Sequence, residues 1–168
     1  MDAATFLALA AACAPQVDAG TAQALVAVES AFNPHAIGVV GGTLMHQPRH
    51  RAEALATARS LQAAGWNFSL GLAQINVHNL ERLGLDLASA FDACRNLGAM
   101  QTVLAECHER AGPTPSPQNQ LRRALSCYYS GNFQTGFEHG YVQRVVRAAS
   151  AGQAAPPSPP TALPKETS

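Results

Sequence analysis

Lysine is almost absent from this chain of 168 residues, and neither lysine nor arginine occurs before Arg49. Lys165 is the single lysine, and 11 basic residues balance 11 acidic ones to give a formal net charge of zero. Nucleic-acid-binding domains usually carry a clear basic excess, so this balance argues against a nucleic-acid partner. The sequence also has no apolar run as long as a membrane-spanning helix requires, and we therefore expect no membrane span.

Metal-binding patterns are missing as well. None of the four cysteines lies in a Cys-x-x-Cys pair, and none of the six histidines belongs to a His-x-x-x-His pair on an unbroken helix. His46 and His50 have that spacing, but Pro48 stands between them and interrupts a helix. We therefore expect neither a metal site nor a cofactor.

The four cysteines, Cys13, Cys94, Cys107 and Cys127, leave two interpretations open. An even number permits two disulfides with three possible pairings, and such bonds are typical of an oxidising compartment such as the periplasm. Alternatively, all four are buried free thiols, because free cysteine is among the most buried residue types.

The length of the chain fits one domain over residues 1–150, with an apolar content of 47% that is enough for a core. The last 18 residues, 151–168, contain five prolines, and we expect them to form a disordered tail. Residues 4–13 are interpreted as a first helix. This apolar stretch resembles a secretory signal only weakly, because the charge before it, on Asp2, is negative.

Helix-forming residues and capping residues predict a mainly α fold with one small β excursion. Asp18 and Asp92 are candidate N-caps. Paired glycines between β-branched residues in segment 37–45 predict a hairpin or an irregular turn, and segment 66–72 is interpreted as a loop. The predicted helices cover residues 4–13, 19–31, 51–64, 73–83, 93–110, 118–130 and 141–150.

Glu29 ends a predicted helix whose other side chains are almost all apolar. With no cation nearby in the sequence, burial would disfavour the ionised carboxylate and raise its pKa. A carboxylic acid that keeps its proton near neutral pH can act as a general acid. The alternative is a solvated glutamate at a frayed helix end.

Three segments carry further polar residues of the kind that line active sites. The first begins at Glu29-Ser30 and ends at Asn33-Pro34, and the second is Gly71-Leu72-Ala73-Gln74-Ile75. The third runs from Ala124-Leu125 through Tyr128-Tyr129 to Gly131, and Tyr141-Val142 follows it.

At these residues the chain resembles the soluble lytic transglycosylases and goose-type lysozymes, whose three motifs occur here in the same order. The stretches 36–42 and 65–71 resemble the lytic transglycosylases of type IV secretion and conjugation systems. The resemblance implies a lysozyme-like α+β fold with a substrate cleft. It also implies that the partners are peptidoglycan glycan strands and type IV secretion system components.

The activity that the resemblance implies is cleavage of the β-1,4 bond from N-acetylmuramic acid to N-acetylglucosamine, with a 1,6-anhydro product. Glu29 would be the single catalytic residue, acting first as acid and then as base. Opening of the cell wall for a secretion apparatus would place the protein in the periplasm. Two alternatives stay open: a hydrolytic muramidase on the same scaffold, and a non-catalytic peptidoglycan-binding subunit of the apparatus.

The same resemblance assigns substrate-binding roles. Gln74 would contact an N-acetyl group, since its amide both donates and accepts hydrogen bonds. Ser69 and Gly71 would let the backbone approach the sugar closely. Ser30 is expected to have only a supporting role.

Three tyrosines complete the predicted site. Tyr128 matches the family tyrosine that faces the acid, and we expect its phenol to hydrogen-bond the Glu29 carboxyl. Tyr129, where the family commonly has asparagine, is the other candidate for the cleft. Tyr141 would close the cleft or simply anchor the last helix.

Overall fold

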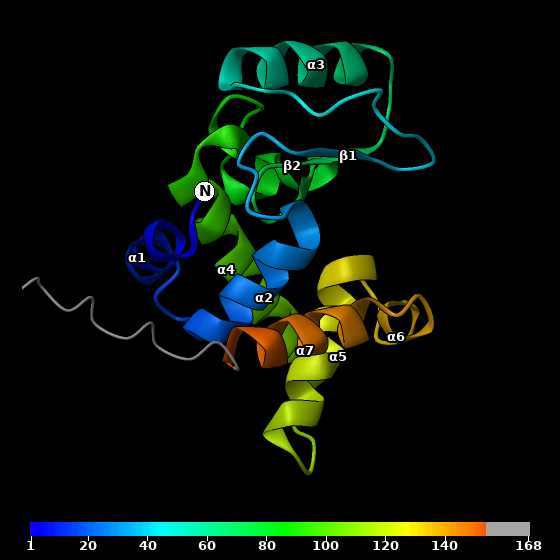
Figure 1. Cartoon of the computed structure of the whole chain (residues 1–168). Coiled ribbons are helices and arrows are strands. Elements are labelled where there is room, and N and C mark those ends of the chain that lie inside the picture. Colours follow the sequence, from blue (N-terminus) through cyan, green and yellow to red (C-terminus); the bar gives the residue numbers. More distant parts are fainter. Residues whose placement is uncertain (154–168) are drawn as a thin grey trace, which may run out of the picture.

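A computed structural model of the protein describes residues 1–153, and within them the chain forms a mainly helical domain with a small antiparallel sheet (Figure 1). This confirms the predicted fold class. The helices are α1 (Ala3–Cys13), α2 (Ala19–Ser30), α3 (Arg51–Ala63), α4 (Ala93–Ala111), α5 (Pro117–Ser130), α6 (Thr135–Glu138) and α7 (Tyr141–Gln153). The strands are β1 (Ile37–Val39), β2 (Phe68–Leu70) and β3 (Ile75–Asn76), and three 3₁₀ helices follow at η1 (Val77–Asn79), η2 (Glu81–Leu83) and η3 (Ser89–Phe91).

The predictions for the first helix, the last helix and the tail have different outcomes. The predicted first helix is confirmed as α1, which Asp2 caps by accepting from the Thr5 amide at 2.9 Å. Helix α7 continues to Gln153, past the predicted end at Ser150. Residues 151–153, predicted as the start of a disordered tail, are therefore helical, and the rest of the predicted tail, 154–168, lies outside the described residues. Within residues 1–153, none of the helices combines the length and apolar character needed to cross a membrane.

Helix α2 forms because a good N-cap precedes a run of small and apolar residues. The Asp18 carboxylate accepts from the Thr21 amide at 2.9 Å, and Leu25 and Val26 are fully buried. The helix lies against α7 in the middle of the domain (Figure 1). It therefore carries its last turn into the interior of the molecule.

The turn after α2 is held in an unusual backbone conformation. Ala31 and Phe32 both have positive φ, 49° and 62°, which costs a non-glycine residue about 1 kcal/mol each. Aromatic packing keeps the turn in place, because the Phe32 ring meets the Phe6 ring of α1 edge to face at 5.2 Å. This contact packs the turn after α2 against α1.

The sheet departs from the sequence prediction. Of the two predictions for segment 37–45, the irregular turn is found, after strand β1, and the hairpin within the segment is not. The partner of β1 is β2, which lies within the predicted loop 66–72, and Gly38 stands opposite Ser69. Alternation explains the pairing, because Ile37, Phe68 and Leu70 are buried while Ser69 points the other way.

The predicted helix 73–83 is replaced by β3 and two 3₁₀ turns. Gln74 adopts a positive φ of 50°, which a right-handed helix does not allow. The buried Asn96 of α4 directs this path: its Oδ1 accepts from the Ala73 amide at 2.8 Å, and its Nδ2 donates to Leu70 O and Ala90 O. A side chain distant in sequence thus satisfies backbone groups on both sides of this turn and holds it in a non-helical path.

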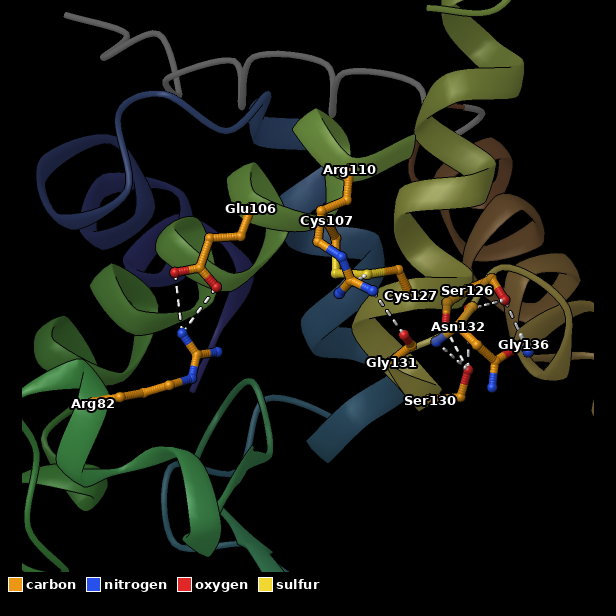
Figure 2. Close-up of a disulfide and its surroundings, with 10 residues drawn as sticks. All are labelled: Arg82, Glu106, Cys107, Arg110, Ser126, Cys127, Ser130, Gly131, Asn132 and Gly136. Atoms are coloured by element: carbon orange, nitrogen blue, oxygen red, sulfur yellow. Dashed lines mark hydrogen bonds and ion pairs between the residues drawn. A yellow bond between two sulfur atoms is a disulfide. The ribbon is translucent and has the colours of Figure 1, made fainter. Parts of the chain in front are cut away.

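The cysteines form two disulfides, Cys13–Cys94 between α1 and α4 and Cys107–Cys127 between α4 and α5, so all four are paired. Figure 2 shows the second bond together with Arg110, which donates from α4 to Gly131 O at 3.2 Å. The sequence left open whether the four cysteines form two disulfides or are free thiols, and the structure has the two disulfides. The second bond holds the end of α5 against α4.

Removing either disulfide should destabilise the fold by an amount that grows with the loop it closes. We expect the double serine variant at Cys107 and Cys127, which are 20 residues apart, to lose about 3 kcal/mol of unfolding free energy. The variant at Cys13 and Cys94, 81 residues apart, should lose about 4–5 kcal/mol. Urea unfolding under non-reducing conditions measures both, and equal stability of parent and variants would contradict the pairing.

Candidate active site

Glu29 lies in the last turn of α2, where its carboxyl group meets a cavity of about 430 Å³. Side chains from α2, the sheet, α4, α5 and the α6 region converge there, although they are far apart in sequence. The residues that line the cavity are Glu29, Gly38, Val39, Val40, Ser69, Gln74, Ile75, Asn76, Asn79, Val103, Tyr128, Tyr129, Thr135 and His139. Glu29 is the single carboxylic acid among them.

The protonation of Glu29 is set mainly by loss of contact with water. Burial raises the pKa of Glu29 from 4.5 to about 7, against the hydrogen bond from Tyr141 and the charge of Arg144, which both lower it. The raised pKa that the sequence predicts is therefore present. Near neutral pH the protonated form of this carboxyl group is therefore populated.

The tyrosine that bonds this carboxyl group is Tyr141, not Tyr128 as predicted. The Tyr141 hydroxyl donates to Glu29 Oε1 at 2.5 Å, and Tyr141 is only 2% exposed, behind the cavity wall. Burial, and next the charge of Glu29, raise the Tyr141 pKa well above its usual value, so the phenol stays a donor. Helix packing brings Tyr141 to the Glu29 carboxyl group, because α7 begins at Tyr141 and runs along α2.

Tyr128 and Tyr129 both line the cavity, with different partners. The Tyr128 hydroxyl donates to Ala73 O at 2.7 Å and so holds the residue before Gln74. The Tyr129 ring is 41% exposed and stacks on Tyr141 with centroids 4.5 Å apart and an interplanar angle of 18°. Its hydroxyl lies 3.1 Å from His139 Nδ1.

Gln74 joins the strands from inside the cavity wall. Its Nε2 donates to Gly71 O at 2.9 Å and to Ala36 O at 3.2 Å, which uses both amide hydrogens. The remaining Oε1 packs over Gly38, where a Cβ atom would come within 2.6 Å of it. Both residues line the cavity, so Oε1 is the atom of Gln74 that is free to accept from a ligand.

Of the two residues predicted to let a sugar approach the backbone, the structure brings only Ser69 to the cavity. Gly71 is buried and absent from the lining. It has a φ of 78°, and a Cβ atom there would meet Asn96 Nδ2 at 2.5 Å. Glycine is needed at this position for the close approach of α4, and the predicted contact between Gly71 and substrate is not supported.

Two positioning residues stand behind the cavity. The Ser30 hydroxyl donates to Leu72 O at 2.7 Å, which ties the end of α2 to the β2–β3 connection. Asn96, described above, orders the same connection from the other side, and the sequence prediction missed it. A signal was present, because Asn96 stands four residues before Met100 on the apolar face of its helix. A polar residue at such a place requires buried partners.

The profile of the Transglycosylase SLT domain matches residues 6–149 of the chain, which includes every residue of the cavity. The chain belongs to the transglycosylase SLT domain family. No solved structure gave a significant match.

Curated relatives of this SLT-domain chain include proteins named for type IV secretion. The Type IV secretion system protein virB1 of Brucella abortus is 52% identical over 151 residues, covering 86% of this chain and 63% of the relative. Protein virB1 of Rhizobium radiobacter is 38% identical over 141 residues, covering 83% and 58%. The chain thus spans less than two thirds of the length of either relative.

Replacing Tyr141 with phenylalanine removes the donor to Glu29 and keeps the ring in place. We expect the pKa of Glu29 to rise above about 7, because the lost hydrogen bond favours the ionised carboxylate. The unfolding free energy should fall by about 1–3 kcal/mol. NMR titration of ¹³C-labelled glutamate carboxyl carbons and urea unfolding measure the two effects.

The matched control is Tyr128→Phe, whose missing hydroxyl bonds a backbone carbonyl instead. In that variant the pKa of Glu29 should stay near its parent value. A Tyr141→Phe protein whose Glu29 titrates at the parent pH or lower would contradict the assignment.

Proposed function

We propose that this chain is a peptidoglycan lytic transglycosylase that cleaves the β-1,4 bond between N-acetylmuramic acid and N-acetylglucosamine. The observation that carries the proposal is a lone carboxyl group, Glu29, that retains a proton near neutral pH and faces a cavity. Family membership supports the same reaction class.

The reaction needs one proton carrier. Protonated Glu29 donates to the glycosidic oxygen as the bond to the muramic C1 breaks, and N-acetylglucosamine leaves with a free hydroxyl. The Glu29 carboxylate then accepts the proton of the muramic 6-hydroxyl as that oxygen bonds to C1. The 1,6-anhydro ring closes without water, Glu29 regains its proton, and the substrate acetamido group stabilises the positive centre in between.

The surroundings of Glu29 fit this scheme better than a two-carboxylate mechanism. Glycosidases that activate water directly place a second carboxylate across the bond. Three other acids are engaged elsewhere: Glu53 accepts from the Arg49 amide, Asp86 accepts from Ser89, and Asp92 caps α4. None of the three lines the cavity.

The polar groups of the cavity take supporting roles. Gln74 Oε1 accepts from the N–H of an N-acetyl group, and the Ser69 hydroxyl bonds a sugar hydroxyl. Tyr128 holds the backbone beside Gln74, and Tyr129 lines the same cavity. Tyr141 orients the acid from behind and does not touch the substrate.

The biological setting belongs to the same proposal. The name of the Brucella relative supports a role beside a type IV secretion system, where local opening of the cell wall lets the apparatus pass. Peptidoglycan lies outside the cytoplasmic membrane, so we propose a periplasmic location. The two disulfides fit an oxidising compartment.

Glu29→Gln should abolish cleavage without unfolding the protein. A glutamine cannot donate a proton at this position, and we expect release of soluble muropeptides from purified sacculi to fall by about 10²–10⁴-fold. Mass analysis of the parent's products should show 1,6-anhydromuramic ends. The control is Glu109→Gln, an exposed glutamate of α4 outside the cavity, which should cleave at the parent rate.

Each alternative gives a different result in this experiment. Products heavier by one water would identify a hydrolytic muramidase. Binding to sacculi with no soluble product from the parent protein would identify a non-catalytic subunit. Full activity of Glu29→Gln would refute the role of Glu29 in either reaction.

The rate should also depend on pH in one direction. Only protonated Glu29 can start the reaction, so kcat/KM should decline as pH rises through about 7, by about tenfold per pH unit well above it. Initial rates on soluble glycan strands between pH 5 and pH 9 measure this decline. A profile that stays flat or rises up to pH 9 would exclude an acid with this pKa.

A further inference from the structure

Tyr129 lines the cavity, and its ring lies directly against Tyr141, the residue that hydrogen-bonds Glu29. It stacks nearly parallel on Tyr141, whose hydroxyl is bonded to Glu29. Tyr129 is 41% exposed and Tyr141 is 2% exposed, so the outer ring covers the inner one. Without it, one face of Tyr141 would open to the water of the cavity.

Several contacts keep the Tyr129 ring in this place. Its hydroxyl meets His139 Nδ1 at 3.1 Å, and the His139 ring stands edge-on to it with centroids 5.8 Å apart. Arg144 of α7 donates to His139 O at 3.0 Å. Helix α6, just before His139, is fixed on α5 by the Ser126 hydroxyl, which accepts from the Gly136 amide at 3.0 Å (Figure 2).

The groups that act on Glu29 come from two helices. From α7, Tyr141 donates to the carboxyl group, and the Arg144 guanidinium, 5.9 Å from the Tyr141 ring centre, supplies positive charge. From α5, the Tyr128 phenol lies close enough to Glu29 that the Glu29 charge raises the pKa of Tyr128. His139 lies beyond Tyr129, at the end of α6. Since Arg144 favours ionisation, exclusion of water is what keeps Glu29 protonated.

We propose that Tyr129 is a positioning residue, whose ring covers Tyr141 and shields the Tyr141 side of the Tyr141–Glu29 pair from cavity water. The proposal rests on the function proposed above, with Glu29 as the general acid. The sequence predicts Tyr129 only as a candidate for the cleft, and the proposal gives its ring a role toward Tyr141. It also separates the ring, which shields, from the hydroxyl, which only ties the ring to His139.

The test compares Tyr129→Ala with Tyr129→Phe by ¹³C NMR titration of the Glu29 carboxyl carbon and by the pH dependence of kcat/KM on soluble glycan strands. In Tyr129→Ala, water reaches the Tyr141 side of the pair while the Tyr141 hydrogen bond remains, so the NMR pKa and the decline in rate should both move down by about half a pH unit or more. In Tyr129→Phe the ring remains, and both should stay at the parent value. Phe137→Ala, which removes an aromatic ring of equal exposure outside the cavity, should also match the parent.

Opposite results overturn the proposal. An unshifted Glu29 titration in Tyr129→Ala, or an equal shift in Tyr129→Phe, would show that the ring does not shield the pair. A lower rate in Tyr129→Phe at an unchanged pH profile would make Tyr129 a substrate contact instead. Tyr129→Asn is the second truncated variant; if neither truncated protein folds, the residue is structural and the proposal also fails.

The NMR titration keeps this proposal separate from the proposed function. The pKa of Glu29 is measured without substrate, so a protein that cleaves no glycan still reports whether Tyr129 shields the carboxyl group. Conversely, an active parent enzyme with an unshifted Tyr129→Ala variant refutes the shielding alone.

Discussion

The hydrogen bond between Tyr141 and Glu29 joins the start of α7 to the end of α2, and the chemistry of the cavity depends on it. A buried carboxyl group needs a partner, and the choice of partner decides its charge. An arginine or lysine at that distance would hold the carboxylate ionised. A phenol satisfies one oxygen without adding charge, so burial can still raise the pKa. Arg144 of α7 lowers the Glu29 pKa but does not overcome the effect of burial.

Side-chain amides perform a second task around the cavity, because the three strands are too short to satisfy their own backbone groups. Gln47 pairs with Ile37 as a neighbouring strand would, accepting from its N–H and donating to its C=O, both at 2.9 Å. Gln74 and Asn96 take carbonyl and amide groups of the β2–β3 connection. The small sheet is therefore ordered largely by side chains that come from outside it.

Much of this structure follows from local sequence, and the rest depends on contacts between distant segments. Asp18 and Asp92 predict the starts of α2 and α4 because an N-cap bonds a backbone group only three residues away. The raised pKa of Glu29 could be foreseen from its apolar helix. The pairing of β1 with β2 could not, since α3 lies between them and no turn sets their register.

The same limit explains the errors at the candidate site. Tyr128 and Tyr141 both follow Glu29 by about a hundred residues, and only the packing of α7 on α2 decides which phenol reaches the carboxyl group. Gly71 has a motif position that suggests a ligand contact. Its actual constraint is the approach of Asn96 from α4, which nothing near Gly71 in the sequence reveals.

The edge-to-face pair of Phe6 and Phe32 gives the first helix an influence beyond its own stability. Phe32 lies in the left-handed turn directly after Glu29 and Ser30, so α1 braces the backbone from which the acid projects. The Cys13–Cys94 bond anchors the other end of that brace to α4, the helix that carries Asn96. Helix α1 is thus joined both to the turn that follows the acid and to the helix that carries Asn96, although it contributes no side chain to the cavity lining.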